Sequence, residues 1–154
     1  TATHALSWWN MIRVGSTITL EAWDLRYKNN LYWNHACGAA PANIIPRFVL
    51  GVRPLEPGFR RVLIHPQPGW LTRVAGTVPI PHGPVAVSLT TGESGSRRLE
   101  VDIPEHVQAT IGLRQRGEGH ATVTVDGNET AGRSDNGQVF VDGIGAGPHE
   151  LLYE

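Results

Sequence analysis

The chain after residue 60 is a series of short segments in which apolar and polar residues alternate. Alternation with a period of two is typical of a half-buried β-strand. Turn residues separate the segments, and the chain holds 18 Gly and 11 Pro in 154 residues. Short strands at this spacing predict an antiparallel β-sandwich. The predicted strands cover residues 61–65, 74–80, 85–90, 99–103, 109–113, 121–125, 138–141 and 149–153.

The first part of the chain has a different composition and is expected to be mostly helical up to residue 52. Helical spacing of apolar residues predicts a helix near residues 6–12 and another over residues 39–50, which Pro46 should kink because its ring removes a hydrogen bond. Residues 23–34 are irregular and predict a loop. Six of the eleven aromatic residues lie in the first 33 positions: Trp8, Trp9, Trp23, Tyr27, Tyr32 and Trp33.

Two helices cannot enclose a core by themselves, so the first part is expected to be the end of a larger helical domain. Pro54, Pro57 and Gly58 interrupt the chain where its composition changes. We therefore assign residues 1–55 to the end of a helical domain and residues 56–154 to a β-sandwich domain. The predicted fold class is α+β.

Charge and cysteine content exclude several classes of protein. The net charge is −1, so the basic surface that binds nucleic acid is not expected. No apolar run approaches the ~18 residues of a membrane helix. A single cysteine, Cys37, excludes an internal disulfide framework and a cysteine-rich zinc site. The histidines form no short metal-ligand pair, and no cofactor is expected. Cytoplasmic and secreted locations are both compatible with the sequence.

Two short segments carry the residue types of a sugar-binding site. In the first, Glu21 stands beside Trp23 and Asp24; in the second, Trp33 precedes Asn34 and His35. Aromatic faces stack on the C–H face of a sugar ring, and carboxylates accept hydrogen bonds from hydroxyl groups or activate water. The alternative for the first segment is a surface glutamate beside a core tryptophan. The alternative for the second is a helix start that Asn34 caps.

Four separate blocks, taken in order, resemble the C-terminal region of bacterial α-L-rhamnosidases of glycoside hydrolase family 78. The blocks are TLEAWD at residues 19–24, WNHACGA at 33–39, GVRPLEPGF at 51–59 and IHPQP at 64–68. The resemblance implies the last helices of an (α/α)6 six-hairpin barrel, followed by the antiparallel β-sandwich domain. It also implies hydrolysis of terminal α-L-rhamnose from glycosides, with inversion.

The same resemblance implies roles for individual residues. Glu21 corresponds to the general base that activates the attacking water, and His35 to a histidine that contacts the sugar. Trp23 and Asp24 are expected to shape the pocket or support the base, and Trp33 is expected nearby as a substrate-binding residue. We expect Glu21 and His35 to lie on one exposed rim.

Inversion needs a second, protonated carboxyl group ~6.5–9.5 Å from the base. In the family this acid lies upstream, in barrel helices that the present sequence does not contain. The chain is therefore expected to be inactive alone and to need the missing N-terminal barrel residues as its partner, with a rhamnosylated glycoside or oligosaccharide as substrate. Two alternatives stay open: a non-catalytic β-sandwich that binds sugar or packs against another domain, and a rhamnose-cleaving lyase or other glycosidase on the same barrel.

Overall fold

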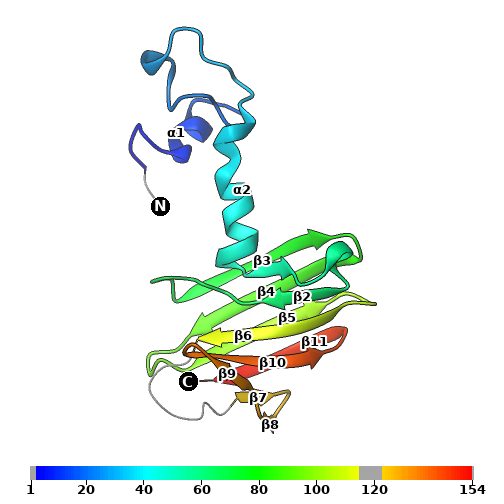
Figure 1. The fold of residues 1–154 in the computed structure, drawn as a ribbon. Helices are drawn as coiled ribbons and strands as arrows, with labels where there is room; N and C mark the ends of the chain where they lie inside the picture. The colour runs from blue at the N-terminus through cyan, green and yellow to red at the C-terminus, as the bar shows by residue number, and fades with distance from the viewer. Residues whose placement is uncertain (1–2, 115–122, 154) are drawn as a thin grey trace. The chain divides into compact units, whose positions relative to one another are not determined.

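The computed structural model describes residues 3–114 and 123–153 (Figure 1). The chain forms two compact units, of which the first ends at Asn43 and the second begins at Ile44. The predicted boundary after residue 55 separates a catalytic domain from a sandwich domain, which is a different division from that between the compact units. It stays a prediction. Within the described ranges, no helix is both long and apolar enough to span a membrane.

The described strands of the second unit form two sheets. One has five strands, in the order β1 (Val52–Pro54), β2 (Arg61–Ile64), β6 (Gln108–Arg114), β10 (Gln138–Ile144) and β9 (Arg133–Asp135). The other has six, in the order β3 (Arg73–Ile80), β4 (Gly83–Thr91), β5 (Arg97–Ile103), β11 (Gly147–Tyr153), β7 (Val123–Val125) and β8 (Asn128–Thr130). A short 3-10 helix, η4 (Pro57–Phe59), connects β1 to β2.

Both sheets contribute to one hydrophobic core, which confirms the predicted sandwich. Val62 and Ile111 come from the five-stranded sheet, Leu99 and Leu151 come from the six-stranded sheet, and all four side chains are fully buried in the same cluster. In β5 the exposed and buried residues alternate along the strand. The period-2 pattern therefore places the apolar face of each sheet toward the other sheet.

The sandwich is not purely antiparallel, and this part of the prediction is wrong. β2 and β6 run parallel, with Val62 opposite Ala109, whereas every other described strand pair is antiparallel. Between β2 and β6 the chain forms three strands of the other sheet before it returns. Parallel neighbours need such a crossover connection, because a hairpin can join only antiparallel strands. Alternation shows which face of a strand is buried but not which strands are neighbours.

Most predicted strands are confirmed, and the strands that the prediction missed are short. β1, β8 and β9 have three residues each, which is too few for a period to be recognised. The strand predicted at 121–125 appears as β7 from Val123, and its first two residues lie outside the described residues.

The predicted helix over residues 39–50 is confirmed, with an unexpected ending. An α-helix, α2 (Ala40–Ile44), continues directly into a π-helical turn, η3 (Ile45–Val49). The N–H of Leu50 donates to the carbonyl of Ile45, five residues back, at 2.9 Å. Pro46 has no N–H, so the regular ladder of four-residue hydrogen bonds is interrupted there. The wider turn accommodates this gap.

The first unit contains less helix than the sequence predicts. Its elements are α1 (Trp8–Arg13) and two 3-10 turns, η1 (Leu25–Tyr27) and η2 (Ala36–Ala39), before α2 begins. Ser7 caps α1 by accepting a hydrogen bond from the N–H of Asn10. The buried apolar side chains of its described residues are Met11, Leu20 and Leu31. The loop predicted at residues 23–34 is confirmed, with η1 inside it.

Candidate functional site

The segment from Thr19 to His35 folds back on itself. The N–H of His35 donates to the carbonyl of Thr19 at 2.8 Å, and the N–H of Glu21 donates to the carbonyl of Tyr32 at 3.1 Å. The hydroxyl of Thr19 adds a third link by donating to the carbonyl of His35 at 2.6 Å. These bonds place the chain segment that carries Glu21 beside the segment that carries His35.

Gly38 permits this close approach. Its N–H donates to the carbonyl of His35 at 3.0 Å, at the first turn of η2. A β-carbon at Gly38 would lie only 3.0 Å from the β-carbon of Thr19 and 3.2 Å from the carbonyl oxygen of Leu20. A larger side chain at this position would therefore push the two segments apart.

The carboxylate of Glu21 is held by two donors from its own loop. The ammonium group of Lys28 forms an ion pair with Oε1, and the N–H of Tyr32 donates to Oε2 at 3.3 Å. The Lys28 hydrogen bond is the largest cause that lowers the pKa of Glu21, followed by the Tyr32 N–H. Desolvation opposes them, and smaller electrostatic effects of Lys28 and His35 lower the pKa further. Glu21 is therefore ionised at neutral pH and can accept a proton or hydrogen bonds at its remaining lone pairs.

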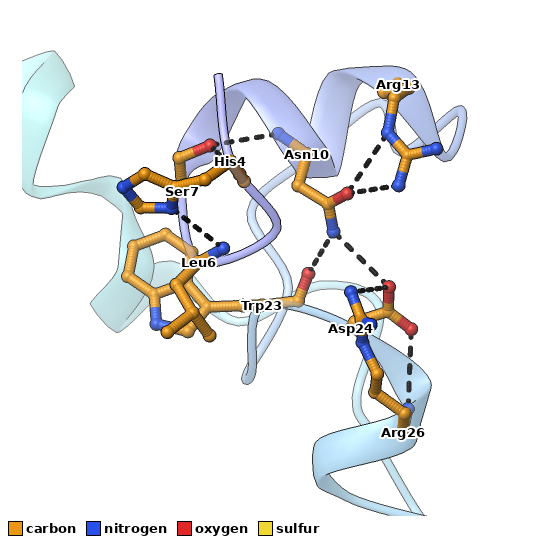
Figure 2. Close-up of polar contacts among 8 residues, drawn as sticks. All are labelled: His4, Leu6, Ser7, Asn10, Arg13, Trp23, Asp24 and Arg26. Atoms are coloured by element: carbon orange, nitrogen blue, oxygen red, sulfur yellow. Dashed lines mark hydrogen bonds and ion pairs between the residues drawn. The ribbon is translucent and has the colours of Figure 1, made fainter. Parts of the chain in front are cut away.

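Asn10 joins α1 to the loop that follows Glu21 (Figure 2). Its side chain is almost fully buried, and its amide nitrogen donates to the carbonyl of Trp23 at 2.7 Å and to a carboxylate oxygen of Asp24 at 3.4 Å. Its amide oxygen accepts from Nη2 of Arg13 at 2.6 Å and from Nε at 3.2 Å. The amide nitrogen thus holds the loop against the helix, whereas the amide oxygen is used within α1 itself.

Asp24 has its carboxylate engaged in the loop itself. It caps η1 by accepting from the N–H of Arg26 at 3.3 Å, and it forms a 3.5 Å ion pair with the Arg26 guanidinium group. The Arg26 N–H is the largest cause that lowers the pKa of Asp24, and the Asn10 amide and the charges of Arg26 and Arg13 act in the same direction. Asp24 therefore stabilises the fold of the loop that presents Glu21.

The predicted tryptophans have two different environments. Trp23 is half-buried against the small core of the unit, and its ring meets that of Trp8 edge to face, with centroids 5.1 Å apart. The indole N–H of Trp8 donates to the carbonyl of Gly38 at 2.9 Å. Trp33 is 46% exposed, and among the described residues its side chain has no hydrogen bond and no aromatic partner. Trp23 thus supports the loop, whereas the ring of Trp33 is exposed to solvent.

The geometry brings Glu21 and His35 together and adds two residues that the sequence did not suggest. Lys28 and Asn10 lie in no recognisable motif, and their partners are visible only once the loop has folded. Among the described residues, no three His, Cys, Asp or Glu side chains gather as metal ligands would. The arrangement supplies an ionised carboxylate beside an imidazole, which suits proton transfer and hydrogen bonding to hydroxyl groups.

Comparison with known proteins identifies a family and a relative that each match part of the chain. The model of a family described as "Bacterial alpha-L-rhamnosidase C-terminal domain" matches residues 51–129. An α-L-rhamnosidase of Alteromonas sp. (strain LOR) is 30% identical in an alignment of length 113 that covers 67% of this chain and 12% of that protein. Glu21 and His35 precede the residues that the family model matches.

Solved structures of α-L-rhamnosidases share the fold. The enzyme from Dictyoglumus thermophilum is 19% identical, with a TM-score of 0.81 over 100% of this chain and 18% of its own. The enzyme from Streptomyces avermitilis, solved in complex with L-rhamnose, is 23% identical, with a TM-score of 0.75 over 99% of this chain and 15% of its own. The chain therefore spans less than a fifth of the length of these relatives.

Proposed function

Because the chain belongs to the family of bacterial α-L-rhamnosidase C-terminal domains, we propose that it is the C-terminal part of an inverting glycoside hydrolase. The complete enzyme would release terminal α-L-rhamnose from glycosides or oligosaccharides. The observation that carries this proposal is the ionised carboxylate of Glu21, held on a folded-back loop beside His35.

We assign residues 1–55 to the end of a helical catalytic barrel and residues 56–154 to its β-sandwich domain. The surface of the first unit supports this assignment. Its described residues bury three large apolar side chains but expose many others, including Leu6, Trp8, Trp9, Ile12, Tyr32 and Trp33. A surface so rich in exposed apolar side chains indicates a missing partner surface, and upstream barrel helices would supply one.

Glu21 is the general base of the proposed reaction. It takes a proton from a water molecule while the water oxygen forms a bond to the anomeric carbon of the rhamnose. The bond from that carbon to the glycosidic oxygen breaks, and its electron pair stays on the oxygen. A protonated carboxyl group from the upstream barrel, ~6.5–9.5 Å from Glu21, protonates this leaving oxygen. Attack from the face opposite the leaving group inverts the anomeric configuration.

The neighbouring residues have supporting roles in this proposal. His35 hydrogen-bonds a hydroxyl group of the sugar, and Trp33 offers an exposed aromatic face for the sugar ring. Trp23 and Asp24 act one step further away, because both hold the loop that carries Glu21.

The test is the release of aryl alcohol from an aryl α-L-rhamnoside by the complete enzyme that carries this chain. Glu21→Gln keeps the shape of the side chain but cannot take a proton, so kcat should fall about 10²- to 10⁴-fold. KM should change little, because the amide still hydrogen-bonds a hydroxyl group. Glu56→Gln is the control, since Glu56 is exposed and paired with Arg61. Unchanged kcat in the Glu21 variant would contradict the proposal.

A further inference from the structure

The β-sandwich contains an open cavity of about 520 Å³ at one of its ends. Arg97 begins β5 in the six-stranded sheet, whereas Arg114 ends β6 in the five-stranded sheet, with Gln138 opposite it in the register. Tyr153, the last residue of β11, is paired with Arg97, so the cavity lies at the end of the sandwich where β11 finishes (Figure 1). Its described lining is His65, Pro66, Gln67, Pro68, Gly69, Arg97, Arg114, Asn136, Gly137 and Gln138.

The charge of the described lining of the cavity favours an anion. Two arginines are among its lining residues, and none of the described lining residues is acidic. Arg97 is fixed over the ring of Tyr153, 5.9 Å from its centroid, and its buried Nε has no hydrogen-bond partner among the described residues. Arginine is the side chain best suited to carboxylate and sulfate oxygens, because its planar donors match their geometry.

The remaining polar groups of the cavity are of the kind that bind hydroxyl groups. Gln67, Asn136 and Gln138 provide amides, each of which both donates and accepts hydrogen bonds. His65 is buried against the ring of Phe140, and burial, with a smaller effect from the charge of Arg53, lowers its pKa. It is therefore neutral at neutral pH and also both donates and accepts. Such a set of groups fits a polyhydroxylated ligand better than a simple ion.

An exposed tryptophan directly follows one of the lining residues of this cavity in the sequence. Trp70 follows Gly69 directly and is 92% exposed. Its loop is fixed by two backbone hydrogen bonds: Gln67 donates to the carbonyl of Phe48 at 3.0 Å, and Leu71 donates to that of Pro68 at 3.2 Å. An aromatic ring presented on a fixed loop, beside amides and guanidinium groups, is suited to stacking on a sugar.

We propose that this cavity, together with Trp70, binds an anionic sugar unit of a glycan, one that carries a carboxylate or a sulfate group. Arg97 and Arg114 bind the anionic group, the amides bind hydroxyl groups, and Trp70 stacks on a neighbouring ring. This inference uses residues of the second unit alone and does not depend on Glu21 being the catalytic base.

Calorimetric titration of the full 154-residue chain tests the proposal with three ligands of equal length. The ligands are a trigalacturonate, its methyl ester, which removes the charge and keeps the sugar, and a sulfated galactose trimer. We expect saturable binding of the trigalacturonate, the sulfated trimer or both, and binding of the ester that is about tenfold weaker. The two anionic ligands distinguish a carboxylate from a sulfate as the preferred group. Far-UV circular dichroism confirms that each sample is folded.

Two exposed residues give variants that should keep the fold. Arg114→Gln should weaken binding of the anionic ligand about tenfold and leave binding of the ester unchanged. Trp70→Ala should weaken binding of both ligands. Arg73→Gln is the matched control, because Arg73 is an exposed arginine that does not line the cavity. Absence of saturable binding by the folded chain would overturn the proposal. Equal loss in the Arg73 and Arg114 variants would overturn it as well, since it would indicate charge attraction without a site.

Discussion

At the scale of single residues, the protonation of Glu21 is set by its own loop. Lys28 and the N–H of Tyr32 both stabilise the ionised carboxylate, and both therefore lower its pKa. A base with a lowered pKa stays ionised into mildly acidic solution. The lower pH limit of activity should thus depend on Lys28, which does not itself touch the reacting atoms in the proposed mechanism.

Replacement of Lys28 by Met removes the largest cause of the lowered pKa. The pKa of Glu21 should rise, so the base becomes protonated at a higher pH than in the unmodified enzyme. The acidic limb of the kcat/KM profile of the complete enzyme should therefore move to higher pH. Lys28→Arg, which keeps the charge, should leave the limb nearly in place. An acidic limb that stays fixed, or moves to lower pH, in the Met variant would be inconsistent with Glu21 as the base.

Asn10 offers a second test at this scale, because its buried amide holds the loop (Figure 2). Asn10→Ala leaves the carbonyl of Trp23 without its donor, at a cost of roughly 1–3 kcal/mol. Local opening of the loop should increase accordingly, and trypsin should cleave after Arg26 roughly tenfold faster or more. Asn34→Ala changes an exposed residue, and trypsin should cleave this variant at the same rate as the unmodified chain. Equal rates for both variants would show that Asn10 does not hold the loop.

Sequence reasoning suggested Glu21 and His35 but missed the residues that position them. The two were recognisable because they stand in short blocks with a known pattern. Lys28 and Asn10 reach Glu21 and Asp24 across 7 and 14 residues of chain, through a loop that has no periodicity. Propensity and alternation carry no information on which side chains such a loop brings together. The predicted roles of the site residues stay predictions until the variants are measured.

At the scale of elements, the long strands could be predicted and the irregular ones could not. Segments such as β5 alternate over seven residues, so the sequence shows both their type and their buried face. The parallel pairing of β2 with β6 depends on a crossover through the other sheet, which no local pattern encodes. The sequence predicts a kink at Pro46, and the structure has the π-helical turn η3 around this residue instead.

Substitution of Gly51, which lies between η3 and β1, tests the close approach of the backbone to His65. Gly51 has a φ of +80°, and a β-carbon there would lie 2.1 Å from the backbone of His65. Gly51→Ala combines a left-handed backbone with a clash that no side chain can relieve, so the free energy of unfolding should fall by roughly 3 kcal/mol or more. Gly127 also has a positive φ but has open space around it, and Gly127→Ala should cost only about 1 kcal/mol. Urea unfolding of both variants measures the difference, and similar losses would refute the clash.

At the scale of the whole molecule, the two units differ in how completely they bury their apolar residues. The sandwich encloses a large core shared by both sheets, whereas the described part of the first unit encloses three buried apolar side chains. The shift in aromatic content along the sequence anticipated this difference. It could not indicate where the chain divides, because the helical segment from α2 to η3 runs through the boundary between the units.

The chain alone should not hydrolyse an aryl α-L-rhamnoside above background. Glu21 can take a proton from water, but inversion also needs a protonated carboxyl group on the other side of the glycosidic bond. Asp24 is engaged with Arg26 and Asn10, and the neighbouring N–H and charges keep it ionised, so it is a poor proton donor. Robust turnover by the purified chain, lost in its Glu21→Gln variant, would show that a second carboxyl group within these residues supplies the acid.

Rescue by azide tests the central claim, that Glu21 activates the attacking water in an inverting rhamnosidase, most directly. In the complete enzyme, Glu21→Gly removes the base and leaves space for a small anion that needs no deprotonation. Azide should restore cleavage of an aryl α-L-rhamnoside, and proton NMR should identify the product as the β-L-rhamnosyl azide, with inverted configuration. Activity of the Gly variant equal to that of the unmodified enzyme without azide, or an azide product of retained α configuration, would contradict the account.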